Sequence, residues 1–422
     1  MFHHHSRQRN KEDRHPVLQG NTSPGRLRLL DESLILGLMN FPQTACDKSD
    51  TGEVDFPRVT VVDLGLGDSP STTLEFAVAL KNVCSMSTIA SPLEPKIIGV
   101  EVDNDRLERC IRLLQDASYS GLLQNTPPIE LRLGGTSFVL PLIESEPRPS
   151  MIRAMNVLRS YGIPHAIKGL RTLFQQLCHE GGTLVEGSAE AGGKVMVAMV
   201  LKRSKMNLTY HVENGDASSS DDEVELGIDA VIFAADLDAI ATDPELNMLS
   251  AHSWFNRHNH LPRLWRGFCD VEECSDEDVP RWALPVREFL RTWEKACSCV
   301  LPITPSVQER LHEIMDQGTN CPRSVTVTAA QTSSSKICWT EQDSTTSLRD
   351  KFVLGAEELA RGIKSDNSSL DSRSPCVKTD WASKGIVVWY PGLDPTSGTP
   401  ALLVPDIEEY YWWEERIGRR VL

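Results

Sequence analysis

The strongest constraint on the fold is an alternation of short apolar runs with amphipathic stretches through the first half of this 422-residue chain. The run at 59–64 (VTVVDL) is rich in β-branched residues, which is typical of a strand buried on both faces of a sheet. Glycines follow it, and then a helix begins either at Ser69-Pro70 or one turn later, with a capping box at Thr72. Further strands are predicted at 96–102, 129–133, 151–157 and 183–186. Strands that alternate with helices predict a parallel sheet covered by helices on both faces.

Two of the stretches between these strands have clear helical periodicity. The first carries apolar residues at i, i+3, i+4 and i+7, namely Leu107, Cys110, Ile111 and Leu114. The second carries Ile167, Leu170, Phe174 and Leu177 on one side, and we expect it to end at Gly181-Gly182. The last two strands, 194–202 and 228–233, have no helix between them and should pair antiparallel. The acidic, serine-rich segment 213–226 is expected to be a mobile loop between them.

The rest of the chain indicates extensions around one main domain at 19–240. We expect a disordered leader at 1–18, a mostly helical extension at 241–316 and a loop- or linker-rich segment at 317–380. The aromatic segment 381–422 could bind a partner, but we expect it to dock onto the core. Docking is favoured because the aromatic run at 410–413 would otherwise expose a large apolar surface.

Composition excludes several classes of function. A net charge of −16 argues against broad binding to duplex nucleic acid, which needs clustered lysines and arginines. A small molecule or a protein is the easier partner. We expect no membrane span and no secretion, so the eleven scattered cysteines predict free thiols in the cytoplasm, with an organelle as the alternative. The pairs Cys269/Cys274 and Cys297/Cys299 lack zinc-ligand spacing, and no metal site is expected. The sequence does not predict an oligomeric state.

A ligand site is predicted where the first strand ends. Gly65 and Gly67 allow the backbone to turn sharply and to approach a ligand, although tight turns without a ligand use the same residues. Glu101 ends the second strand, where a carboxylate can accept the hydroxyls of a ribose. A capping or solvated acid is the alternative. Asp103 competes for this role, but it lies closer to the next helix and better suits its N-cap.

The runs VVDLGLGDSPSTTLEFA and IIGVEVDNDRLERC resemble the glycine-rich motif and the acidic second-strand motif of class I S-adenosylmethionine (SAM) dependent methyltransferases. The closing antiparallel hairpin is similar to the end of their seven-stranded sheet. GNTSPGRLRLLD, RPSMIRAMNVLRSYG and GGTLVEGSAE resemble segments of a little-characterised bacterial-type group. The resemblance covers about residues 19–240. It implies a Rossmann-like α/β sheet of seven strands with an antiparallel terminal hairpin, flanked by mixed N- and C-terminal extensions.

The resemblance also implies a SAM site, with the glycine loop under the methionine part, Glu101 at the ribose and Gly134–Phe138 at the adenine. Phe138 is a candidate for ring contact, with core packing as the alternative. Two features depart from the family: Ser69 replaces the third glycine, and no Asp follows the third strand to read the adenine amino group. The implied cofactor-binding residues are Asp63, Gly65, Gly67, Ser69, Glu101, Gly135, Phe138 and Asn156.

Asn156 ends the fourth strand, where this class often places residues near the methyl group, and Arg153, Arg159 and Tyr161 could orient a substrate. Asn156, Arg159 and Tyr161 are thus the candidate catalytic residues, with a turn residue, a surface charge and a core ring as the respective alternatives. The segment lacks the Asn-Pro-Pro-Tyr and Pro-Cys signatures of nucleic-acid methyltransferases.

The expected reaction is an in-line displacement of the SAM methyl group by a nucleophile on the acceptor. The main alternative function is a non-catalytic SAM-binding module with a regulatory or scaffold role. An aminopropyltransferase would need paired acids after the fourth strand. An NAD-dependent oxidoreductase would need a third glycine where Pro70 stands.

Overall fold

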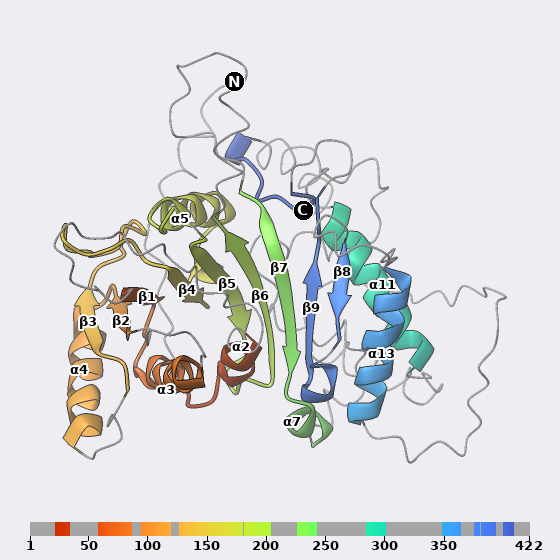
Figure 1. The fold of residues 1–422 in the computed structure, drawn as a ribbon, viewed down its shortest axis with the longest axis horizontal. Helices are drawn as coiled ribbons and strands as arrows, with labels where there is room; N and C mark the ends of the chain where they lie inside the picture. Colours follow the sequence, from red (N-terminus) through yellow and green to blue (C-terminus); the bar gives the residue numbers. More distant parts are fainter. Residues whose placement is uncertain are drawn as a thin grey trace, which may run out of the picture.

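The computed structural model describes residues 22–33, 58–86, 94–119, 126–179, 181–203, 226–242, 284–300, 348–363, 375–379, 381–393 and 400–408. Their centre is one sheet in the order β3-β2-β1-β4-β5-β6-β7-β9-β8 (Figure 1). The first five strands are parallel: β1 (Arg58–Leu64), β2 (Glu94–Glu101), β3 (Ile129–Leu133), β4 (Met151–Met155) and β5 (Thr183–Ala189). The direction of strand order reverses between β1 and β4, which is the place where open α/β sheets bind ligands.

Helices cover both faces of this sheet, as the alternating pattern predicts. On one face lie α2 (Arg28–Ser33), α3 (Ser71–Met86) and α4 (Asn104–Tyr119). On the other lie α5 (Ile163–Gln175), α11 (Leu284–Val300) and α13 (Leu348–Gly362), packed over the largest apolar cluster. A short helix, α7 (Leu237–Ala241), follows β7. The sheet and its two helical layers therefore form a Rossmann-like α/β fold (Figure 1).

The closing hairpin is confirmed. Strands β6 (Val195–Lys202) and β7 (Ile228–Ala235) pair antiparallel with each other, and β6 also pairs antiparallel with β5. All but one residue of β6 is buried, so this hairpin continues the interior of the sheet instead of forming a solvent-exposed edge.

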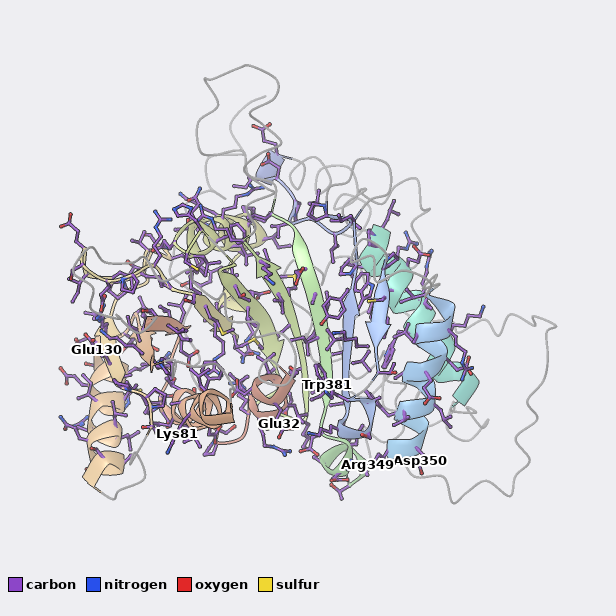
Figure 2. All side chains as sticks on the ribbon, viewed as in Figure 1. Glu32, Lys81, Glu130, Arg349, Asp350 and Trp381 are labelled. Carbon is purple, nitrogen blue, oxygen red and sulfur yellow. The ribbon has the colours of Figure 1, made fainter. Side chains whose placement is uncertain are left out.

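Among the described residues the sheet has nine strands, so the prediction of seven is wrong in number. Strand β9 (Ile386–Tyr390) pairs antiparallel with β7, and β8 (Cys376–Lys378) pairs with β9. The β-branched and aromatic run IVVWY covers what would otherwise be an exposed edge at β7. Gly385 allows this approach, because a Cβ there would lie 1.9 Å from the carbonyl oxygen of Ala235. The part of the aromatic segment that the structure describes thus docks onto the core, with Trp381 packed against a buried apolar cluster of the sheet (Figure 2).

Two local predictions also differ from the structure. Helix α5 ends at Gln175, before Gly181-Gly182, because the backbone N–H of Gln176 turns back to the carbonyls of Leu173 and Phe174. The range 317–380 contains α13, whose buried Phe352, Ala356 and Leu359 pack in the cluster shared with α11.

Several predicted features lie outside the described residues. They are the leader at 1–18, the acidic loop up to residue 225, the pair Cys269/Cys274 and the aromatic run at 410–413. Among the helices that the structure describes, none is long and apolar enough to cross a membrane.

Candidate functional site

A glycine turn follows β1 at the carboxyl edge of the sheet. Gly65 and Gly67 adopt φ angles of +85° and +71°, in the left-handed region that favours glycine. A Cβ on Gly65 would lie 2.7 Å from Cγ2 of Val157, so glycine is also required for packing. The N–H of Gly65 donates to the carbonyl of Val100 at 2.8 Å, which joins the turn to β2. The turn therefore brings backbone close to the switch point between β1 and β4.

Glu101 lies at the end of β2, and its side chain is turned onto this backbone. The residue is 2% exposed. One carboxylate oxygen accepts the N–H of Gly67 at 2.8 Å, and the other accepts the N–H groups of Val102 and Asp103 at 3.0 and 3.1 Å. A carboxylate offers about four acceptor positions, so one remains at Glu101. Asp103 caps α4 as expected, because its side chain accepts the N–H of Arg106 at 3.0 Å.

Arg153 occupies the interior beneath the turn and is 0% exposed. Its guanidinium binds Asp63 through two hydrogen bonds of 2.9 and 2.8 Å, and it donates to Asp31 of α2 at 2.5 Å. The ring of Phe76 lies 4.4 Å from its central carbon. Arg153 is thus a buried structural cation and not a group that faces a substrate. Because Thr73 also donates to Asp63 at 2.5 Å, the Asp63 carboxylate keeps one acceptor position.

The network carries two carboxylates and one cation, and its charges do not balance. Burial raises the pKa of Asp31 to about 7, while Arg153 opposes this rise and Asp63 adds to it. The second oxygen of Asp31 has no hydrogen-bond partner among the described residues. Burial alone would lower the pKa of Arg153, but the two aspartates hold it above its usual range.

Asn156, directly after β4, has a left-handed backbone with φ +62°. Its side-chain oxygen accepts the N–H of Ala189 at 2.9 Å, and its own N–H donates to Gly187 at 2.8 Å. These bonds hold the end of β4 against β5 and orient the side-chain NH₂ group as a remaining donor. Asparagine adopts this conformation more readily than most other non-glycine residues, and residues in this conformation are often found at functional sites.

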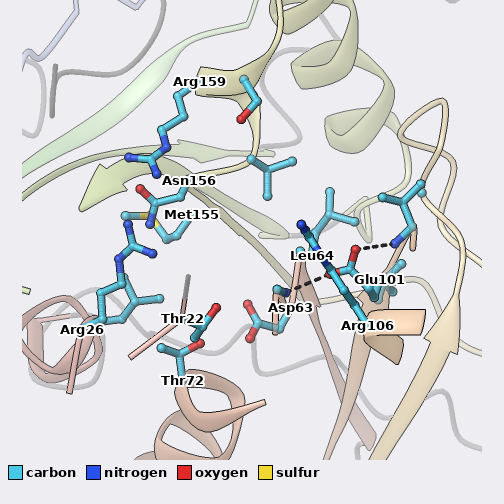
Figure 3. Close-up of a pocket in the computed structure, with 18 of the residues that line it drawn as sticks. Thr22, Arg26, Asp63, Leu64, Thr72, Glu101, Arg106, Met155, Asn156 and Arg159 are labelled. Carbon is cyan, nitrogen blue, oxygen red and sulfur yellow. Dashed lines mark hydrogen bonds between the residues drawn. The ribbon is translucent and has the colours of Figure 1, made fainter. Parts of the chain in front are cut away.

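Two arginines lie near Asn156 in the cleft (Figure 3). Arg26 donates to the carbonyls of Ala189 and Glu190 at 2.8 and 3.1 Å. Burial and the charge of Arg159 lower its pKa to about 10, while Glu190 opposes this shift. Burial also lowers the pKa of Arg159. A guanidinium with a pKa of about 10 is still protonated at neutral pH, so Arg26 keeps its positive charge in the cleft.

The structure brings most of the predicted site residues into this cleft. Those that line it are Asp63, Gly65, Gly67, Glu101, Gly135, Asn156, Arg159 and Tyr161. Ser69 does not line it, because its hydroxyl contacts Ser71 at the start of α3. Phe138 is 5% exposed and packs edge-on against Tyr161 with ring centroids 5.0 Å apart, so it takes the core position that the sequence left as the alternative.

Sequence reasoning missed Thr22, Arg26, Arg106 and Met155, which also line the cleft. Arg26 reaches it through contacts with residues more than 160 positions away, and no local pattern reveals such a contact. Within the described part of the chain, no group of three or more His, Cys, Asp or Glu side chains could hold a metal.

Comparison with known proteins gives likenesses at the level of structure only. No family model and no curated protein matches the chain. A SAM-dependent methyltransferase from Methanosarcina mazei is 16% identical, with a TM-score of 0.22, over 30% of this chain and 50% of its own. Magnesium protoporphyrin IX methyltransferase from Synechocystis, solved with bound S-adenosylhomocysteine (SAH), is 13% identical, with a TM-score of 0.24, over 37% and 53%. The CcbJ methyltransferase from Streptomyces caelestis is 16% identical, with a TM-score of 0.25, over 52% and 69%.

The chain thus spans about half the length of the first two solved structures. All three are named as methyltransferases. At these identities and TM-scores the function has to be argued from the residues of this chain.

Proposed function

We propose that the chain is a SAM-dependent methyltransferase. The observation that carries the proposal is the junction of Gly67 and Glu101, where a left-handed glycine after β1 donates its N–H to a buried carboxylate at the end of β2. The junction lies beside the point where strand order reverses, with Asn156 across the cleft at the end of β4. Backbone that approaches closely and a carboxylate that can accept from a ribose are the features that a nucleoside cofactor needs at this place.

The donors and acceptors in the cleft fit SAM. Glu101 retains one acceptor position, which suits a ribose hydroxyl, and Gly65 and Gly67 have no side chains in the path of the methionine part. Gly134 and Gly135 also line the cleft, and a flat adenine would lie against their backbone. When bound, SAM supplies an electrophilic methyl group on a sulfonium centre.

Among the described residues that line the cleft, the carboxylates are Glu101 and Asp63, and each is held by three hydrogen bonds. We infer that this described part of the cleft aligns the acceptor and does not offer it a free base. Burial and the charge of Glu101 raise the pKa of Tyr161, so its phenol stays protonated at neutral pH and acts as a donor. We therefore infer an acceptor, a small molecule or a protein, whose nucleophile needs no base from this site.

The test is isothermal titration of the purified chain with SAM and with SAH. Glu101→Gln should weaken both by more than tenfold, because it loses the negative charge and rearranges the Gly67 turn. The matched control is Glu108→Gln on the exposed side of α4, which should leave both affinities within twofold. Circular dichroism of each variant confirms that it is folded.

Transfer is tested separately with SAM carrying a tritiated methyl group, incubated with fractions of cellular small molecules and proteins. Label that moves to one fraction with the wild type, but not with Glu101→Gln, supports a methyltransferase. Tight binding without any transfer would favour the non-catalytic SAM-binding module. If folded wild type binds neither SAM nor SAH, the proposal is wrong.

A further inference from the structure

Three charged side chains from three different elements meet beneath the cleft. Arg153 of β4 contacts Asp63 of β1 on one side and Asp31 of α2 on the other. We call these three residues the charged triad, and all of them are buried. When both aspartates are ionised, the triad has one net negative charge inside the protein. Such a charge is costly unless a proton or a cation balances it.

Asp63 is the member of the triad that lines the cleft. Its Oδ2 accepts hydrogen bonds from Arg153 and Thr73, whereas among the described residues its Oδ1 accepts only from Arg153. One acceptor position on Oδ1 is therefore open. Figure 3 shows this carboxylate in the cleft beside Thr22 and Thr72. A cation bound in the cleft can thus be paired with Asp63.

Asp31 does not line the cleft, and one of its oxygens is unused. Its Oδ1 accepts from Arg153, but its buried Oδ2 has no hydrogen-bond partner among the described residues. Burial raises the pKa of Asp31 to about 7 against the opposing effect of Arg153. Besides Arg153, the charged groups that act most on Asp31 are Asp63 and Glu75, and those that form ion pairs on α2 are Arg28, Glu32 and Asp236. Asp31 can therefore gain or lose a proton near neutral pH.

The N-terminal segment that carries Asp31 is attached to the walls of the cleft. Thr22 donates to the carbonyl of Leu66, between the two glycines of the turn, at 2.9 Å. The N–H of Gly25 donates to both carboxylate oxygens of Glu75 in α3, at 2.7 and 3.0 Å. Asp31 is thus held in a fixed place relative to the glycine turn, although it stands 32 positions before Asp63 in the sequence.

We propose that Asp31 is a positioning residue for the cofactor, which acts through Arg153 on Asp63. The assignment rests on the proposed methyltransferase function. When Asp31 is ionised, Arg153 is shared between two carboxylates, and the net negative charge of the triad attracts the ammonium group of the methionine part of SAM to Asp63. When Asp31 holds a proton, Arg153 balances Asp63 alone, and the attraction is weaker.

The proposal fixes the sign of a pH dependence. A ligand cation at Asp63 favours the ionised form of Asp31, so binding releases a proton from Asp31 to solvent. The affinity for SAH, which carries the same ammonium group, should therefore rise with pH between 5.5 and 7.5. Each unit by which the ligand lowers the pKa of Asp31 changes the affinity by about tenfold between the two protonation states. None of the described residues that line the cleft is a histidine that could produce the same profile.

The test is titration of SAH and of 5′-methylthioadenosine, which lacks the ammonium and carboxylate groups, at pH 5.5, 6.5 and 7.5. Wild type should bind SAH at least about fivefold more tightly at pH 7.5 than at pH 5.5, and its affinity for methylthioadenosine should change less than about twofold. Asp31→Asn should bind SAH with the same weak affinity at every pH, because its amide does not ionise. Glu32→Gln is the matched control: it removes a negative charge from the next position of α2 and should keep the wild-type profile.

A second measurement does not depend on the variants. The heat of SAH binding to wild type at pH 7, compared in two buffers of different ionisation enthalpy, gives the number of protons released, and we expect a fraction of one proton. Binding without proton release would overturn the proposal.

A structural role alone for Asp31 predicts a different result. Asp31→Asn would then weaken SAH and methylthioadenosine alike and leave the pH profile of SAH unchanged, which would also overturn the proposal. If folded wild type binds neither nucleoside, the methyltransferase function is wrong and this proposal fails with it.

Discussion

Replacing Arg153 by methionine should cost more stability than replacing any exposed arginine of the chain. The substitution keeps an unbranched side chain against Phe76 but removes the cation that holds Asp63 and Asp31. Both carboxylates are buried and would be left without a counter-charge. Breaking a buried ion pair from one side costs about 3–5 kcal/mol, because the remaining charge keeps its desolvation penalty.

The free-energy cost of protonating an aspartate gives a loss of stability of the same size. An orphaned carboxyl escapes its charge by binding a proton, which at pH 7 costs about 1.36 kcal/mol for each unit between that pH and a reference pKa of about 3.9. This gives about 4 kcal/mol for one aspartate. Asp31 already has its pKa raised to about 7 by burial, so most of the new cost falls on Asp63. We therefore expect Arg153→Met to lose about 4 kcal/mol at neutral pH.

The loss should depend on pH with a defined sign. A carboxyl whose pKa is raised in the folded state binds a proton more tightly there than in the unfolded chain. The variant therefore regains stability as pH falls and loses it as pH rises. Urea unfolding followed by far-UV circular dichroism at pH 5 and pH 8 measures this. The penalty should be smaller at pH 5.

The control is Arg109→Met, which breaks an ion pair with Asp68 whose side chains are 44% and 45% exposed. It should cost less than about 1 kcal/mol at either pH. Our reasoning about the buried network is refuted if Arg153→Met stays within about 1 kcal/mol of wild type at pH 8. A penalty that is equal at pH 5 and pH 8 would refute it as well.

Three further predictions follow from individual contacts. The free energy of unfolding of wild type should fall as pH rises from about 4 to 7, because the raised pKa of Asp31 makes the folded state bind an extra proton. Asp31→Asn should make this fall smaller. Urea unfolding at several pH values measures the slope. Asn156→Ala should lower the unfolding free energy by about 1 kcal/mol more than Asn156→Gly, because alanine resists the left-handed backbone and both lose the bond to Ala189; equal values from calorimetry would contradict this. Gly385→Ala should cost more than about 2 kcal/mol and speed hydrogen exchange in β9, because its Cβ would overlap the carbonyl of Ala235; unchanged exchange would show that β9 does not depend on this approach.

The strands and the glycine turn could be predicted because their information is local. The run VTVVDL and the two glycines after it specify strand and turn within ten residues, and the structure follows them. The ends of elements were less accurate. Strand β4 stops at Met155 because Asn156 turns into the left-handed region, which its residue type permits but does not require. Strand β9 was missed as a sheet member because its partner β7 lies about 150 residues earlier.

Contacts between residues far apart in the sequence also explain why the site could be predicted only in part. Asp63 stands in the motif at the position that implies a cofactor contact, yet most of its hydrogen bonds go to Arg153 and Thr73. Arg153 comes from the neighbouring strand β4 and also reaches Asp31 in α2, so one buried cation joins the glycine turn to the N-terminal segment that carries Arg26. No spacing in the sequence indicates this connection, because the three charged groups are separated by 32 and 90 positions. Whatever displaces α2 therefore removes the Asp31 contact from Arg153 and also moves the neighbouring Arg26 out of the cleft. Binding at the glycine turn and docking of the N-terminal segment should therefore be thermodynamically coupled.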